Sequence, residues 1–492
     1  MPGGESFTIA LFLTTAGILL GASAVFSGAT RRLGLPVGLV FVGIGILAGR
    51  EGIGHVGFDD VAFAWRLGTV ALVLILFDGG LNTPAASFRV AVWPASVLAT
   101  AGVAGTAAAV GVAARLLGFP WELALLLGAV VSSTDAAAVF SILRTSGVQL
   151  QKRVGATLEL ESGLNDPMAV ILTVALTEQL ATGRPLGWRT AVELVLKLAG
   201  GGVAGLAIGH AGRWVLGRVR LPVGGLYPVL TTALAFLSFG LPELFHGSGF
   251  LSVYVAAVIV GNGPIPFRGG VLRAHDAGAW FLQVSMFLVL GLLAVPSRIL
   301  HAWPVGLALG AFLLVARPLV VVPILALFGY RWPERLYVGW VGLRGAVPVV
   351  LALVPILAQA PGAERVLDAV FFVVLVNTVV LGLTVRRGAR RLRLQTARPP
   401  PPQGLVEISP SRPLDAAIDT FYVDPASAVA NSRLADLPPF PAGSAVLMIL
   451  RGDDLLPARG ATELLPGDHV YVLTRPEDRP FVHLLFGEAE EG

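Results

Sequence analysis

The sequence predicts an α-helical polytopic membrane protein with an internal inverted repeat, two broken crossing helices and a small α/β cytoplasmic domain at its C-terminal end. Three observations predict this class. Only 13% of the 492 residues are charged, whereas a soluble domain carries roughly 25%. The mean hydropathy is +0.78, and 55% of the residues are hydrophobic. Long apolar runs recur until about residue 386, where the composition becomes polar.

About thirteen apolar runs are long enough to cross a bilayer, which takes about 20 residues each. The first run, 7–26, follows no basic leader region, so we interpret it as a span and not as a removed signal. The predicted span centres are Gly17, Val42, Val73, Gly102, Leu127, Val170, Gly201, Thr232, Val255, Phe287, Leu314, Val347 and Val374.

The positive residues indicate the orientation of the chain. Alternate loops, together with the segment after the last span, hold eighteen lysines and arginines, while the opposite loops hold six, with Arg66 at their edge. Because basic loops stay in the cytoplasm, we expect a plasma (inner) membrane protein with its N-terminus outside and its C-terminus inside. The same placement of arginines favours a lipid membrane over nucleic acid as the partner, despite the net charge of +4.

The cysteine count excludes several chemistries. With no cysteine in the chain, disulfide frameworks, thiolate metal sites and cysteine nucleophiles are ruled out. We expect no cofactor.

Two spans are interrupted by residues that break helices. Ser132-Ser133-Thr134-Asp135 interrupts span 5, and the segment 342–348, which contains two glycines and Pro348, interrupts span 12. Spans 5 and 12 lie an odd number of spans apart, so the two helices run in opposite directions through the membrane. This is typical of inverted repeats in secondary transporters, which bind substrate at the broken helices. Spans 1 to 6 and 8 to 13 form the two predicted halves.

The chain divides into a transmembrane domain (1–394), a proline-rich linker (395–403) and a cytoplasmic domain (404–492). Pro399 to Pro402 predict a stiff connection. Beyond them, short runs at 420–423, 444–450 and 469–473 carry β-branched or alternating residues between Pro-Gly turn signals, which predicts strands.

Few ionisable residues fall inside the predicted spans, and each is a functional candidate because a charge in the bilayer core is costly. They are Asp78, Asp135, Glu161, Asp166, Arg317 and Arg344. On one helix Ser162 and Asp166 share a face, as do Glu161 and Asn165, whereas Glu161 and Asp166 point about 140° apart. We therefore expect Ser162 and Asp166 to face an ion site, and Glu161 and Asn165 to face a neighbouring structural contact.

A monovalent cation requires several oxygen ligands, and a broken helix exposes carbonyls that can supply them. Asp135, Asp166, Ser162 and a free carbonyl near Thr134 form the predicted cage. Two carboxylates in a low-dielectric site cannot both ionise freely, so protons and cations compete for it. Alternate occupancy combined with alternating access is coupled exchange.

Simpler interpretations stay open for several of these residues. Asp135 would also serve as a cap for the helix that follows it. We expect Glu161 and Arg344 to form a buried structural ion pair that bridges the repeats. Arg317 is interpreted as a countercharge to a helix break, and Asp78 as either a water-linked site residue or a cap at a span end.

Four motifs in this order resemble the monovalent cation:proton antiporters of the NhaP/NHE type, over about residues 7 to 386. They are Phe77-Asp78-Gly79-Gly80, Thr134-Asp135, Glu161-Ser162-Gly163-Leu164-Asn165-Asp166-Pro167 and Gly342-Leu343-Arg344-Gly345-Ala346. The resemblance implies a homodimer whose core domains shift across the membrane like an elevator.

The resemblance also implies residue roles. Asp166 is the expected ion and proton carrier, joined by Asp135, Ser162 and the Thr134 carbonyl, and Glu161 pairs with Arg344. Many relatives carry glutamate at the position of Asp78. Because aspartate has a shorter side chain than glutamate, a role for Asp78 in contacting the ion stays open. Relatives with the Asn-Asp pair, here Asn165-Asp166, are commonly electroneutral, so we expect exchange of one cation for one proton.

The tail from about Gly404 to Phe486 resembles the C-terminal lobe of potassium-transport regulatory domains of the TrkA-C type. The pattern includes Phe421-Tyr422-Val423 and Leu464-Leu465-Pro466-Gly467-Asp468. Together the two resemblances indicate the potassium/proton branch, with an unidentified small ligand for the tail. Sodium/proton exchange is the alternative. A tail-gated channel would require a carbonyl selectivity filter, and an intramembrane aspartyl protease different residues around its aspartates; the sequence shows neither pattern.

Overall fold

The computed structural model describes residues 2–33, 36–183, 187–396, 417–425, 427–452, 454–475 and 477–487. The chain divides into two compact units, Met1–Thr396 and Ala397–Gly492, and each is described by itself. From residue 397 onward the predicted linker, including Pro399 to Pro402, lies outside the described residues, as do residues 404–416 of the predicted tail domain.

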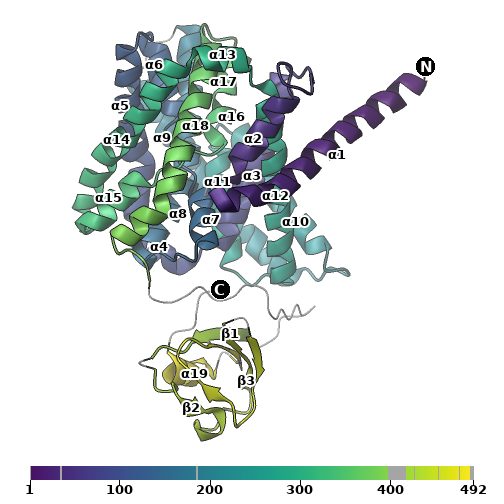
Figure 1. The fold of residues 1–492 in the computed structure, drawn as a ribbon, viewed down its shortest axis with the longest axis vertical. Helices are drawn as coiled ribbons and strands as arrows, with labels where there is room; N and C mark the ends of the chain where they lie inside the picture. Colours follow the sequence, from purple (N-terminus) through teal and green to yellow (C-terminus); the bar gives the residue numbers. More distant parts are fainter. Residues whose placement is uncertain are drawn as a thin grey trace. The chain divides into compact units, whose positions relative to one another are not determined.

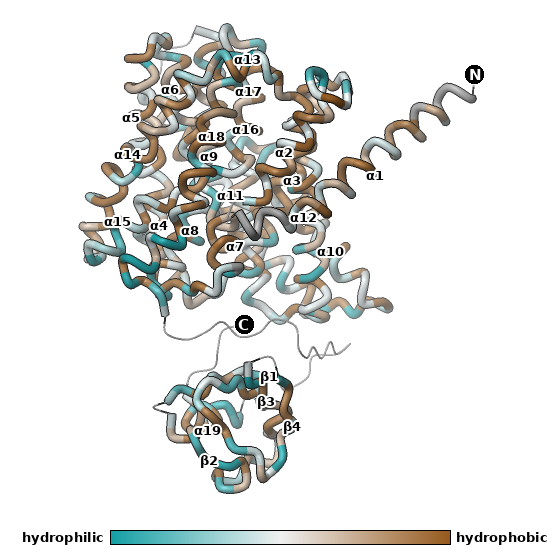
Figure 2. Tube along the Cα trace, in the orientation of Figure 1, coloured by the Kyte–Doolittle hydropathy of each residue, from teal (hydrophilic) through white to brown (hydrophobic). Residues whose placement is uncertain are grey.

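Helices build the first unit, and hydrophobic residues run along most of them (Figures 1 and 2). Among the described residues, eight helical stretches are long and apolar enough to cross a membrane, and four shorter apolar helices accompany them. The helical elements are α1 Pro2–Leu33, α2 Val37–Ala48, α3 Val61–Asn82, α4 Ala85–Val97, the π-helical turn η1 Leu98–Gly102, α5 Val103–Leu116, α6 Trp121–Val130, α7 Ala136–Thr145, α8 Lys152–Thr182, α9 Trp188–Arg218, α10 Leu226–Leu244, α11 Gly249–Gly261, α12 Arg268–Leu293, α13 Pro296–His301, α14 Trp303–Leu327, α15 Trp332–Trp340, α16 Val347–Leu351, α17 Leu353–Leu357 and α18 Ala363–Arg391.

The predicted interruptions in spans 5 and 12 are confirmed. Helix α6 ends at Val130 and α7 begins at Ala136, while α15 ends at Trp340 and α16 begins at Val347. All of the predicted span centres fall within helical segments. The number of membrane crossings itself stays a prediction.

Local sequence explains where the broken helices restart. The Asp135 side chain accepts a hydrogen bond from the Ala138 amide at 3.0 Å, which caps the first turn of α7. Helix α16 has Pro348 in its first turn, where a missing N–H removes no helical hydrogen bond. The glycines before it disfavour continuation of α15. Short stretches of sequence therefore determine where both helices break.

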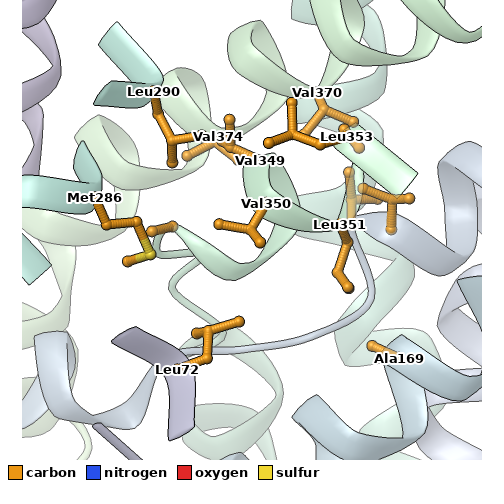
Figure 3. Close-up of a cluster of buried hydrophobic side chains, with 14 of the residues drawn as sticks. Leu72, Ala169, Met286, Leu290, Val349, Val350, Leu351, Leu353, Val370 and Val374 are labelled. Carbon is orange, nitrogen blue, oxygen red and sulfur yellow. The ribbon is translucent and has the colours of Figure 1, made fainter. Parts of the chain in front are cut away.

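The short helices α16 and α17 lie within the main hydrophobic core. Figure 3 shows Val350 and its neighbours on α16 among buried side chains from α3, α12 and α18. A Cβ added at Gly68 on α3 would lie 2.8 Å from a Val350 methyl carbon, so glycine allows α3 to approach α16 closely. Close packing of this kind holds the restarted helix of the second break in place.

Helix α9 packs against α11 through small residues. A Cβ added at Gly205 would lie 2.7 Å from the Ser252 carbonyl oxygen, and one at Gly209 would lie 3.0 Å from the Ala256 Cα. Gly201 makes a similar approach to Ser248. The glycine-lined face of α9 therefore packs closely on α11, as faces of small residues do in membrane helices.

The second unit confirms the predicted small α/β domain. Its elements are β1 Ala417–Tyr422, β2 Ser432–Arg433, the short 3₁₀ turn η2 Leu434–Asp436, β3 Ala445–Arg451, β4 Asp454–Pro457, β5 Glu463–Leu464, β6 His469–Thr474 and α19 Arg479–Phe486. The antiparallel sheet has the order β1-β6-β3-β4, with Phe421 opposite Val470, and β2 pairs with β5. The three predicted strand runs overlap β1, β3 and β6.

An ion pair between the partly exposed Arg451 and the buried Asp468 holds one end of this sheet together. The Arg451 Nε donates to the Asp468 carboxylate at 2.8 Å, and Asp468 also accepts from the Leu465 amide at 2.8 Å. Hydrogen bonding to Asp468 raises the pKa of Arg451 above its ordinary value. The turn between β5 and β6 uses Gly467 at a φ of 101°, a conformation that favours glycine.

Candidate functional site

The two helix breaks meet at what is here called the crossing, where hydrogen bonds join one break to the other. The Asp135 amide donates to the Leu343 carbonyl at 2.7 Å. In the opposite direction, the Arg344 Nε donates to the Val131 carbonyl at 3.1 Å. Backbone groups that the breaks leave without helical partners are thus satisfied across the crossing, which is required of irregular backbone at membrane depth.

Helix α8 passes this crossing and contacts the first break. The Ser162 Oγ donates to the Thr134 carbonyl at 2.8 Å and accepts from the Ala136 amide at 3.0 Å. The Asn165 Nδ2 donates to the Thr134 Oγ1 at 2.6 Å. The Thr134 carbonyl is therefore not free as predicted, because it accepts the Ser162 hydroxyl, but its second lone pair leaves the predicted ligand role a prediction. Asn165 contacts the broken helix and not the neighbour that Glu161 binds.

Asp135 and Asp166 are brought together at this point. Ser162, one helical turn before Asp166 on α8, contacts the residues on both sides of Asp135, and the Ser133 side chain lies beside the Asp166 carboxylate. Among the described residues, the Asp166 Oδ1 and the Ser133 Oγ are buried without a hydrogen-bond partner. Asp135 combines two tasks, since one carboxylate oxygen caps α7 and the other lies against Gly345. Unpaired oxygens beside paired carboxylates are suited to hold a cation, a water molecule or a proton.

The prediction that Glu161 pairs with Arg344 was wrong. Glu161 pairs with Arg317 instead, and one guanidinium nitrogen donates to both carboxylate oxygens at 2.9 and 3.0 Å. Both side chains are buried. Arg317 lies on α14 and reaches α8 directly, so it is the countercharge of Glu161 and not only of a helix break.

Arg344 is fully buried and serves backbone groups. Besides the Val131 carbonyl, it donates to the Gly342 carbonyl within its own break. Its own carbonyl accepts from the Thr378 hydroxyl at 3.0 Å, which ties the break to α18. The Nε and one terminal nitrogen of Arg344 thus bind carbonyls of the two breaks where a carboxylate partner was expected, while its Nη2 is buried without a hydrogen-bond partner among the described residues.

Asp78 lies in a different neighbourhood from the two aspartates. Near the end of α3, its carboxylate accepts from the Asn82 amide nitrogen at 3.2 Å, and its charged neighbours are Asp276 and Arg144. Nearby, the Thr83 hydroxyl donates to Glu159 on α8 at 3.1 Å. The structure therefore does not place Asp78 within the cluster around Asp166, and a direct ligand role for it gains no support.

Sequence reasoning left three residues of the site without a role. Ser133 and Gly345 stand inside the motifs that were recognised, so their positions were visible but their contacts were not. Thr378 lies on α18, and no local pattern distinguishes it from other threonines in spans. Contacts of this kind depend on helices that are distant in the sequence.

Gly345→Ala is expected to reduce transport sharply. A Cβ at this position would overlap the Asp135 carboxylate, so the carboxylate or the second break must shift. Misplacement of a site group by about 1 Å reduces rates by tenfold or more, and we expect a loss of that size in the exchange rate. Gly240→Ala on α10, where an added Cβ meets open space, is the matched control. A wild-type rate for Gly345→Ala would contradict the close contact.

Both units of the chain are similar to known protein families. The transmembrane family described as sodium/hydrogen exchanger matches residues 21–390, and the TrkA-C domain matches residues 420–480. A K(+)/H(+) antiporter NhaP2 of Shewanella sp. (strain ANA-3) is 39% identical over 99% of this chain and 85% of its own length. A K(+)/H(+) antiporter NhaP of Alkalimonas amylolytica is 37% identical over 98% of this chain and 84% of its own length. A Na(+)/H(+) antiporter NhaP of Pseudomonas aeruginosa is 32% identical over 70% of this chain and 84% of its own length.

Solved structures share the fold at lower identity. The sodium proton antiporter MjNhaP1 from Methanocaldococcus jannaschii at pH 8 covers 78% of this chain and 99% of its own, with a TM-score of 0.62 and 21% identity. An electron-microscopy structure of the same protein gives a TM-score of 0.65, also at 21% identity, over 78% of this chain and 98% of its own. These neighbours support the membrane fold alone. From the family match and the relatives, the chain belongs to the sodium/hydrogen exchanger family of transmembrane cation/proton antiporters, which are transporters and not enzymes, and it carries a TrkA-C domain.

Proposed function

We propose that this protein exchanges potassium ions for protons across the plasma membrane at the Asp135–Asp166 site. The observation that carries the proposal is the meeting of two aspartates at the crossing of two broken helices, with unpaired oxygens on Asp166 and Ser133. Asp166 is the proposed carrier. Asp135, Ser162 and Thr134 supply further oxygens, and Asn165 orients Thr134 through its side-chain hydrogen bond.

The proposed mechanism is competition for one site. A cation that binds between the two carboxylates favours their ionised forms, and a proton that binds there neutralises the charge which attracts the cation. When the occupied site is presented to alternate sides of the membrane, movement of one ion requires return of the other. Because Asn165 adds no titratable charge beside Asp166, one cation for one proton is the simplest balance.

Potassium is favoured over sodium by the extent of similarity. The two K(+)/H(+) relatives match nearly the whole chain, including the segment with the TrkA-C domain, whereas the Na(+)/H(+) relative matches 70% of it. Sodium/proton exchange at the same residues is the second candidate. Selectivity depends on the size and rigidity of the oxygen cage, which is a property of the occupied site.

Three further features belong to the proposal. The N-terminus faces outward and the C-terminus faces the cytoplasm, as supported by the distribution of Lys and Arg over alternate loops. The protein works as a homodimer, and the TrkA-C domain binds an unidentified small ligand that regulates transport.

Everted membrane vesicles with a pH-sensitive dye test the proposed exchange. After acidification of the interior, we expect potassium and rubidium to release protons at lower concentrations than sodium and lithium do. The Glu364→Gln variant is a suitable control, since Glu364 is exposed and pairs with Arg298 away from the site. A stronger response to sodium would favour the second candidate. No response to any of the four ions between pH 6 and 9 would reject the proposed exchange.

The proposed stoichiometry is tested by current. Proteoliposomes on a supported membrane are given a potassium concentration jump at a clamped pH gradient. One-for-one exchange moves no net charge, so the current should not exceed that of the Asp166→Asn variant. A larger current that persists in the wild type would show electrogenic exchange and leave the identity of the cation unaffected.

A further inference from the structure

An open surface depression, here called the cavity, lies at the end of α9, and its lining residues are exposed. It has a volume of about 380 Å³ and is lined by His210, Arg213, Trp214, Gly217, Arg218 and Pro264. The five residues from α9 follow the spacing i, i+3, i+4, i+7 and i+8, so they occupy one face of its last two turns. Pro264 comes from the loop between α11 and α12. The cavity is thus formed between a helix end and a neighbouring loop.

The cavity carries positive charge without an acidic partner. Across the described ranges, neither Arg213 nor Arg218 forms an ion pair with an aspartate or glutamate. The Arg218 guanidinium lies over the Trp214 ring, 4.4 Å from its centroid. A Cβ added at Gly263 would lie 2.9 Å from the Arg213 Cδ, so the stem of Arg213 lies across this glycine. Both guanidinium groups are therefore positioned by packing and free to bind an anion.

The face of α9 that lines the cavity is apolar earlier in the helix and basic at its end. Leu196, Val203 and Leu206 are exposed by 63%, 66% and 51%. Steps of seven residues lead from Leu196 through Val203 to His210, so the apolar stripe runs directly into the basic cavity. The opposite, glycine-lined face packs on α11, as described above. An exposed apolar stripe that ends in arginine and tryptophan is the arrangement expected where acyl chains give way to lipid head groups.

We propose that this cavity binds the phosphate of an anionic phospholipid, with its acyl chains along the stripe of Leu196, Val203 and Leu206. Guanidinium groups bind phosphate oxygens in pairs of charge-assisted hydrogen bonds, and basic pockets between spanning helices bind lipid head groups. The Trp214 ring packs against the Arg218 guanidinium, and tryptophan is a residue type enriched at membrane interfaces. The proposal does not depend on which cation is transported.

Lipid binding here would stabilise the loop that carries Pro264. In the same loop, Asn262 accepts from the Ala85 amide at 2.7 Å and donates to the Thr83 carbonyl at 2.9 Å. Thr83 in turn donates to Glu159 on α8, the helix that carries Asp166. A bound lipid would therefore stiffen a segment that contacts the transport helix, and we expect it to raise the thermal stability of the protein.

Lipid binding to the full-length protein in detergent tests the proposal. Phosphatidylglycerol in mixed micelles is titrated, and bound lipid is counted by native mass spectrometry alongside the melting temperature. The Arg213→Ala/Arg218→Ala variant should bind at least about tenfold more weakly, since it loses the charged donors. The Arg89→Ala/Arg220→Ala variant removes the same charge from exposed arginines outside the cavity and should stay within about twofold of the wild type. If Arg213→Ala/Arg218→Ala fails to fold, the Arg213→Gln/Arg218→Gln variant takes its place in the experiment, because glutamine keeps part of the aliphatic stem.

Further arms separate the sources of phosphate. Zwitterionic phosphatidylcholine should bind more weakly than phosphatidylglycerol, and inorganic phosphate at millimolar concentration should not raise the melting temperature. Equal stabilisation by inorganic phosphate would assign the cavity to a free anion and overturn the lipid. Unchanged phosphatidylglycerol binding by the cavity variant would overturn the site. Loss of dimers in this variant without any change in lipid binding would assign the face to a second copy of the chain.

Discussion

Asp166→Asn is expected to abolish cation/proton exchange while leaving the protein folded. Asparagine has the same shape but does not titrate in this range, so the site loses its carrier of both charge and proton. The structure shows why the fold should survive, because the Asp166 Oδ1 has no hydrogen-bond partner among the described residues. Dye dequenching in everted vesicles should fall to the level of vesicles without the protein, for potassium and for sodium alike.

Asp135→Asn gives an instructive comparison. This residue also caps α7 through its carboxylate, and asparagine is an equally good cap, so its replacement should abolish exchange while the melting temperature stays close to that of the wild type. Retained exchange in Asp166→Asn, with a normal amount of protein in the membrane, would refute the carrier role. Retained exchange in Asp135→Asn alone would assign that residue to capping.

Glu161→Gln is expected to lower the free energy of unfolding by about 3 kcal/mol or more, because it strands the buried Arg317 guanidinium. The partner is identified by two double-mutant cycles on the purified protein, one with Arg317→Gln and one with Arg344→Gln. Coupling should be large between Glu161 and Arg317, whose atoms lie 2.9 Å apart, and small between Glu161 and Arg344. Thermal melting with chemical denaturation supplies the energies.

The Arg344 variant serves as the control for this pair. Its removal frees the Val131 and Gly342 carbonyls, so it should also destabilise the protein, but independently of Glu161. Stronger coupling of Glu161 to Arg344 than to Arg317 would restore the pairing that the resemblance implied. An unchanged melting temperature in Glu161→Gln would show that the ion pair makes no net contribution.

The sequence by itself determined the membrane class, the helical segments and both breaks. These follow from local physics. A run of about 20 apolar residues is set by bilayer thickness, and glycine, proline or a capping aspartate ends or begins a helix wherever it stands. Asp135 was expected to cap α7 or to bind a cation; the structure shows the cap, and the cation-binding role stays a prediction. The strands around Phe421, Ile449 and Val470 were legible for the same reason, because alternation is local.

Only the tertiary structure decided which groups meet. Arg317 and Arg344 were both intramembrane arginines, and the sequence provided no distance from either to Glu161. The Thr134 carbonyl was expected to be free, yet the Ser162 hydroxyl occupies it, and Asp78 lies apart from the aspartates. The physical reason is that a buried polar group binds whatever partner packing places beside it, and packing joins helices that are far apart in the chain.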